Sequence, residues 1–186
     1  MKTTVTRLYD RYQDAAAAVN ALMEAGFPAE DVSLVVNNAG NPHLTVTTPV
    51  ADAPDAAGAG AGAGALLGGG AGLLAGLGLM AIPGLGPVVA AGWLAATAAG
   101  AVAGAAAGAA AGGIVDALTA SGVNEEHANV YAESLRRGGA LVTARAEEDR
   151  VGPVEAVLDR FSPVDPDERG RSYRESGWSR FDANLD

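Results

Sequence analysis

Cysteine is absent from the 186-residue sequence, which excludes disulfides, a thiol nucleophile and a zinc–thiolate site. Basic residues are few, because 12 Lys and Arg face 22 Asp and Glu and leave a net charge of −10. So acidic a chain lacks the basic stripe that binds nucleic-acid phosphates, and it gains no electrostatic attraction to an anionic membrane surface. The N-terminus also lacks the apolar core of a signal peptide, which favours a cytoplasmic location for the polar parts.

Groups that carry enzymatic chemistry are also sparse. The two histidines, His43 and His127, lie on different predicted elements and lack the spacing of metal ligands. Glu125, Glu126 and Glu133 fall on one predicted helix, where acidic side chains complement the positive helix start or face solvent. The glycine-rich run contains no Gly-Lys-Ser/Thr phosphate-loop motif. The sequence therefore predicts a protein that is not an enzyme, with no cofactor and no metal site.

Charge is missing altogether from residues 56–115, which consist mainly of Ala, Gly, Leu and Val. Glycine recurs there at four-residue steps, which would place the glycines on one face of a helix. The predicted helix-packing residues are Gly60, Gly64, Gly68, Gly72, Gly76, Gly100, Gly104, Gly108 and Gly112. Between the two ladders the run from Ile82 to Pro87 contains two prolines and breaks a helix. The pattern predicts a helical hairpin over 56–119, with helices at 57–81 and 88–119.

Three interpretations of this segment remain open, and one of them is a disordered low-complexity linker. Glycine faces let helices pack closely in lipid, and each predicted helix is long enough to cross a hydrocarbon core. This favours a membrane hairpin whose turn approaches the far leaflet, with Trp93 as an interfacial aromatic and both flanks in the cytoplasm. Ala and Gly insert poorly into membranes, so the alternative is a zipper that pairs with copies of itself in water.

The flanking segments have the patterns of a small α+β domain. Strands are predicted at 2–9, 31–37, 43–48 and 140–146, and helices at 12–25 and 125–137. This order, strand–helix–strand–strand–helix–strand, predicts a ferredoxin-like βαββαβ split domain. Residues 1–50 would form its N-terminal half and residues 120–161 its C-terminal half, with the hairpin inserted between them.

The C-terminal end carries the remaining candidate sites. A short helix is predicted at 152–161, followed by a Pro-rich, charged tail, 162–186, for which the sequence predicts disorder. The candidate docking anchors for a protein partner are the tail aromatics Tyr173, Trp178 and Phe181. Arg136 and Arg137, together with Tyr131, are a candidate anion or interface site; the alternative is that the two arginines complement the helix end.

Several of these segments resemble a known family. They are Arg7 to Asp10, Ala25 to Phe27, the glycine-zipper insert, and residues 122–142 with their Arg-Arg-Gly-Gly-Ala-Leu-Val run. Over roughly residues 2–161 the chain resembles bacterial general stress proteins of the 17M-like type, also described as low-temperature-induced proteins. The family pattern has Pro where this chain has Asn124. The resemblance implies stress-linked expression, often a predicted membrane hairpin, and no established enzymatic activity.

Two functional hypotheses follow from the sequence. In the first, a non-enzymatic stress-associated protein self-associates through its hairpin in or at the membrane and displays a cytoplasmic ferredoxin-like domain. In the second, a soluble oligomeric module binds a ligand or partner through its sheet face, with the hairpin as a dimerisation arm. Both predict a homo-oligomer.

Overall fold

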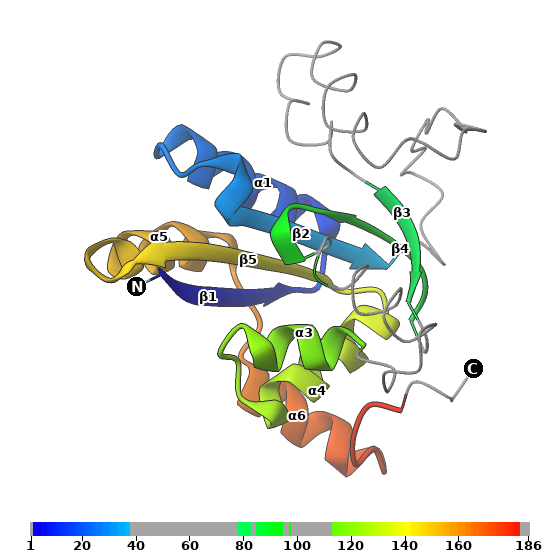
Figure 1. Ribbon diagram of the computed structural model, residues 1–186. Helices are drawn as coiled ribbons and strands as arrows, with labels where there is room; N and C mark the ends of the chain where they lie inside the picture. The colour runs from blue at the N-terminus through cyan, green and yellow to red at the C-terminus, as the bar shows by residue number, and fades with distance from the viewer. Residues whose placement is uncertain (1, 38–77, 83–84, 95–96, 98–112, 183–186) are drawn as a thin grey trace, which may run out of the picture.

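A computed structural model describes residues 2–37, 78–82, 85–94, 97 and 113–182. These residues form an α+β fold with a five-stranded antiparallel sheet (Figure 1). The strands are β1 (Lys2–Tyr9), β2 (Val32–Asn37), β3 (Gly78–Ile82), β4 (Gly86–Ala91) and β5 (Ala140–Glu147). The α-helices are α1 (Tyr12–Glu24), α3 (Ile114–Ala120), α4 (Glu125–Arg136), α5 (Val151–Leu158) and α6 (Pro166–Glu175). The 3-10 turns are η1 (Ala29–Asp31), η4 (Glu148–Arg150) and η5 (Asp159–Phe161).

The strand order is β1-β5-β2-β4-β3, so the C-terminal strand β5 lies between β1 and β2. It is antiparallel to both of them, and α1 connects β1 to β2. The predicted α+β class is confirmed, whereas the ferredoxin-like topology is not. The predicted third strand, 43–48, lies outside the described residues, and β4 occupies the edge of β2 opposite β5.

The prediction of helices at 57–81 and 88–119 is wrong on both sides of the turn that was expected to join them. Residues 78–82 and 86–91 are the paired strands β3 and β4, with Leu85 in the turn between them, and α3 covers only the end of the second predicted helix. Val88 and Ala90 of β4 pack into the core with Val35 of β2. This burial and the β preference of valine outweigh the helical pattern. All nine ladder glycines lie outside the described residues.

The membrane localisation expected from this stretch is contradicted. Among the described residues no helix combines the length and the apolar character needed to cross a bilayer. Residues 78–82 and 85–91, which the prediction placed around the turn of a membrane hairpin, belong instead to the sheet and its connecting turn. Trp93, expected at the membrane surface, contacts Arg145 of β5.

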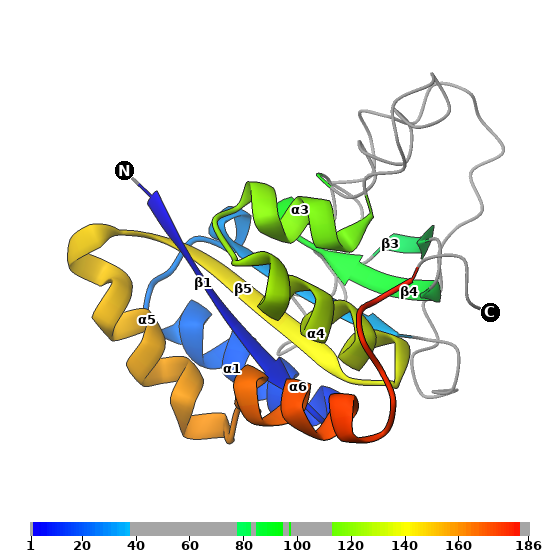
Figure 2. The same cartoon turned by 90° about the horizontal axis from the view of Figure 1, so that it is seen from below.

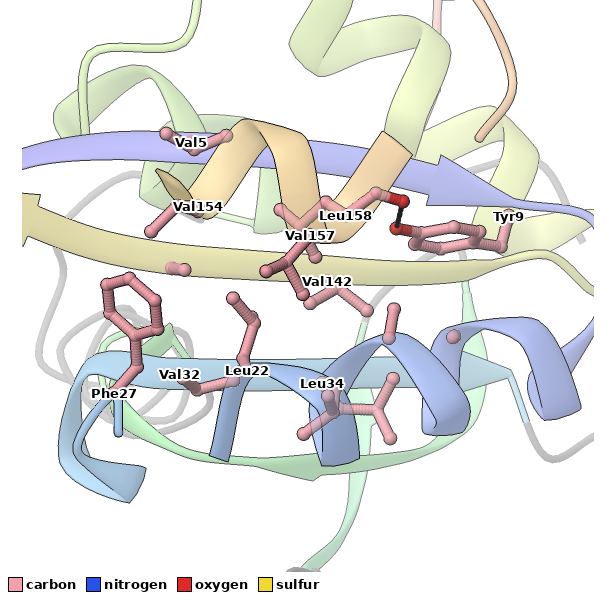
Figure 3. Packing of buried hydrophobic residues seen from close by; sticks show 14 of the residues in the cluster. Val5, Tyr9, Leu22, Phe27, Val32, Leu34, Val142, Val154, Val157 and Leu158 are labelled. Atoms are coloured by element: carbon pink, nitrogen blue, oxygen red, sulfur yellow. Dashed lines mark hydrogen bonds between the residues drawn. The ribbon is translucent and has the colours of Figure 1, made fainter. Parts of the chain in front are cut away.

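Helices cover both faces of the sheet, with α1 and α5 above it in Figure 1 and α3, α4 and α6 below. Alternation along each strand divides the buried side chains between the two faces. Val142 of β5 faces α1 and α5, where it packs with Leu22 and Leu158 (Figure 3). The Tyr9 hydroxyl donates a 2.9 Å hydrogen bond to the Leu158 carbonyl, and burial raises the pKa of this phenol. The sheet face under α1 and α5 therefore forms an apolar core that contains the buried hydrogen bond between Tyr9 and Leu158.

The predicted disorder of residues 162–186 is wrong over α6 and the residues that flank it. Asp165 caps this helix by accepting hydrogen bonds from the backbone N–H groups of Asp167 and Glu168. Tyr173 of α6 is buried, and Phe181 belongs to the same core cluster as Tyr131 of α4. Helix α6 lies beside α4 (Figure 2). The polar composition suggested disorder, but these two apolar contacts attach the segment to the domain.

The Phe181 side chain provides a test of this attachment, since it is only 7% exposed. Replacing a buried Phe with Ala typically costs about 3–5 kcal/mol, so Phe181→Ala should lower the free energy of unfolding measured in urea. The exposed neighbour supplies the matched control, Arg180→Ala, which should unfold like the wild type. Equal stability of the two variants would mean that the tail is not docked.

Candidate functional site

The sheet face beneath α3 and α4 changes from apolar to polar along the strands. Leu8, Leu141 and Val35 form one cross-strand row in the core. Two residues further along, Thr6 lies opposite Thr143, which lies opposite Ser33. Side chains two residues apart share a face, so this polar row continues the apolar one. Its three residues are buried, and Thr143 is 0% exposed.

An aromatic side chain and a cation adjoin the polar row. Arg145 follows Thr143 by two residues on β5, and its guanidinium carbon lies 4.8 Å from the centre of the Trp93 ring. Trp93 is half-buried and packs against the core beneath α3 and α4. We refer to Thr6, Ser33, Trp93, Thr143 and Arg145 as the Thr143 cluster.

The position of Trp93 depends on Gly92 at the end of β4. Gly92 has φ +85°, and a Cβ atom there would lie 2.1 Å from the Val32 carbonyl oxygen. Only glycine permits both this dihedral angle and this close approach to β2. The chain therefore crosses tightly over β2, where the Ser33 hydroxyl donates to the Ala91 carbonyl, before it reaches Trp93.

The Arg145 guanidinium is held in place through its Nη2 atom. Its Nη2 lies 3.1 Å from Asp31 Oδ1 and donates a 3.1 Å hydrogen bond to the Glu30 carbonyl. Asp31 is buried and also pairs with Lys2 through its other carboxylate oxygen. These contacts and the Trp93 ring fix the plane of the guanidinium. They leave the Arg145 Nε–H without a partner.

Unpaired buried polar atoms are concentrated in this cluster. Among the described residues, six buried side-chain N or O atoms have no hydrogen-bond partner. Four of them belong to the cluster: Thr6 Oγ1, Thr143 Oγ1, Trp93 Nε1 and Arg145 Nε. Of the other two, Asp31 Oδ1 is ion-paired with Arg145, and Trp178 Nε1 lies on the C-terminal segment. Each unpaired buried group costs about 1–3 kcal/mol, so such groups are usually satisfied by another protein group or by an ordered water molecule.

The predicted arginine site has a different role. Arg136 Nη2 and Arg137 Nε lie 2.7 and 2.6 Å from the same carboxylate oxygen of Glu133, which is 1% exposed. The guanidinium of Arg137 also lies over the Tyr173 ring, 4.3 Å from its centre. Both cations are thus engaged within the chain. Burial raises the pKa of Tyr131 to about 12, so this residue is neutral and offers no charge to such a site.

The tail aromatics contact their own chain. The Tyr173 and Ser134 hydroxyls are hydrogen-bonded at 3.0 Å, and Trp178 meets the Tyr173 ring edge-on at 5.7 Å. Phe181 is in the core, so these contacts use the three predicted anchors within the domain. His127 contacts Asp167 at 2.8 Å, which joins α4 to α6. His43 and the ladder glycines lie outside the described residues.

Sequence reasoning missed the Thr143 cluster. A signal was present, because Thr4 and Thr6 in β1 and Thr143 and Arg145 in β5 alternate with apolar residues. Alternation of this kind ordinarily marks the solvent side of a half-buried strand. Only the register of three strands shows that Thr6, Thr143 and Ser33 lie side by side, with Arg145 next to them in contact with Trp93.

Comparisons with protein-family models, with curated proteins and with solved structures found no match to this chain. A functional assignment therefore depends on the geometry of the chain itself.

Two of the three buried hydroxyls of the polar row should respond oppositely to removal. Thr143→Val deletes an unpaired hydroxyl at nearly constant volume, so the ligand-free protein should become more stable by about 1 kcal/mol. Ser33→Ala removes a hydroxyl that is hydrogen-bonded to the Ala91 carbonyl, so it should lower stability by about 1 kcal/mol. Urea denaturation measures both changes. A loss of stability in Thr143→Val would show that its hydroxyl has a partner.

Proposed function

We propose that this chain is a non-enzymatic module that binds a small polar ligand at the Thr143 cluster and self-associates through its glycine-rich segment. The observation that carries the binding function is the concentration of four unpaired buried polar atoms in one cluster. If these residues had only a structural role, their unpaired buried groups would lower the stability of the fold and nothing would offset that cost. Bound ligand would supply the missing hydrogen bonds and recover that free energy.

Side-chain exposure decreases from Arg145 towards the buried hydroxyls. The Arg145 side chain is 35% exposed. Trp93, which contacts it, and Thr4, which lies opposite it on β1, are half-buried. Thr143 and Thr6 lie deeper on the sheet. A ligand entering beside Arg145 would therefore pass along the Trp93 ring towards the two hydroxyls.

A binding role agrees better with this chemistry than a catalytic one. Within the described part of the chain neither threonine hydroxyl of the cluster has a hydrogen-bond partner, so no base there is positioned to activate it. The only carboxylate that the described contacts place against the cluster is that of Asp31, which pairs with Arg145 and Lys2. The resemblance to general stress proteins adds the proposal that the module acts under stress.

Ligand binding can be tested by thermal denaturation against a panel of small anions, amides and sugars. A ligand that binds only the folded chain raises the Tm by mass action. At least one class should raise the Tm of the wild type, and Thr143→Val should lose most of that increase. Thr3→Val is the matched control, because Thr3 is exposed and lies on the opposite face of β1. Either no shift at millimolar concentrations or equal shifts in both variants would contradict the proposal.

Self-association is supported by the sequence alone, through the glycine ladder. Smooth glycine faces allow close approach of two helices, and leucine would separate them. The double substitution Gly104→Leu and Gly108→Leu should therefore reduce the oligomer seen by analytical ultracentrifugation. Leucine at Ala105 and Ala109, off the ladder, is the control. An unchanged oligomer in the glycine variant would exclude the ladder as the interface.

A further inference from the structure

We infer that the ligand of the Thr143 cluster is a small oxyanion, either a carboxylate or a phosphate. This inference depends on the proposed binding function and specifies the chemical class of the ligand. Three observations support it: most of the unpaired groups are hydrogen-bond donors, the Arg145 guanidinium lies beside them, and Thr143 is fully buried.

The unpaired groups are mainly donors. The Trp93 Nε1–H and the Arg145 Nε–H can only donate, and the two threonine hydroxyls can rotate to donate. The one unpaired acceptor-only atom nearby is Asp31 Oδ1, which already faces the Arg145 guanidinium at 3.1 Å. A ligand that satisfies this set must therefore present several acceptor lone pairs. Oxyanions do so, whereas a metal cation or an ammonium group does not.

Charge favours an oxyanion over a neutral carbonyl group. Arginine stays protonated in proteins, and hydrogen bonds from it to an anion are about twice as strong as neutral ones. Lys2 and Arg145 share the single carboxylate of Asp31. Glu147 faces Lys2 across the strands but is exposed at the end of β5, where solvent screens it. The Arg145 Nε–H is thus the charged donor nearest the buried hydroxyls.

The surroundings restrict the size of the ligand. The Arg145 guanidinium lies against the Trp93 ring, and Thr143 is fully buried within the sheet. The register holds Thr6 opposite Thr143, so their hydroxyls can approach one ligand group together. This arrangement suits one carboxylate or phosphate group rather than an extended molecule. The same compactness excludes a polymeric anion, in agreement with the acidic net charge of −10.

Trp93 reports on its own site once Trp178, the second tryptophan, is replaced. In full-length Trp178→Phe protein, sodium acetate and sodium phosphate would be titrated at constant ionic strength made up with sodium chloride, and Trp93 emission recorded. Acetamide is the neutral isostere of acetate. A saturable emission change with at least one oxyanion, and none with acetamide, is expected.

Substitutions at Thr143 test the assignment of the site. In the same background Thr143→Val should raise the Kd by about tenfold, the loss expected for one hydrogen bond to a charged group. Thr143→Ser keeps the hydroxyl and should restore most of the affinity, and Thr3→Val should leave it unchanged. These comparisons separate binding at the cluster from an effect of salt on stability.

The outcomes distinguish the two proposals. Saturation by acetate alone identifies a carboxylate site, saturation by phosphate alone a phosphate site, and saturation by both a general oxyanion site. Saturation by acetamide but by neither anion would overturn the oxyanion assignment and leave the binding function intact. No saturable change with any probe, together with no ligand in the thermal panel, would overturn both proposals. Oxyanion binding that Thr143→Val leaves unchanged would overturn this site.

Discussion

The pairing of β5 on both of its edges is the constraint on which the rest of this structure depends. Eight residue pairs join β5 to β1, and five join it to β2. The C-terminal strand is therefore held between two strands, β1 and β2, that come from the N-terminal end of the chain. The register also has to be correct, because a one-residue slip would move every β5 side chain to the other face. Val142 would then leave its core, and Arg145 would be turned into it.

The same register creates the candidate site. Thr143 meets Thr6 on one side and Ser33 on the other only when β5 pairs as observed. The close approach of Gly92 to β2 then places Trp93 beside Arg145. No loop has to close over these residues to bring them together. The donors are thus held in place by the most extensively paired part of the sheet, which preorganises them for a ligand.

Local patterns in the sequence predicted the elements whose signals lie within a few residues. The helix start at Asn124 is an example, since its side chain accepts a 2.7 Å hydrogen bond from the His127 N–H. By contrast, an uninterrupted apolar run fits both helical and strand periodicity, so β3 and β4 were mistaken for helix. Helix α6 was missed because its order depends on Tyr173 and Phe181 reaching α4 from a polar segment. The Thr143 cluster was missed because its residues meet only through strand register.

Two buried polar groups in this chain differ in a way that separates structural from binding roles. Glu133 is a buried charge, and two arginines on its own helix and helix end neutralise it, so nothing further is required there. Thr143 is equally buried, but its hydroxyl and the neighbouring donors have no partners among the residues that the structure describes. Burying a polar group without a partner costs free energy, and α4 shows that this chain satisfies such groups internally when they serve stability. This difference between Glu133 and Thr143 is the reason for proposing that a ligand satisfies the donors of the Thr143 cluster.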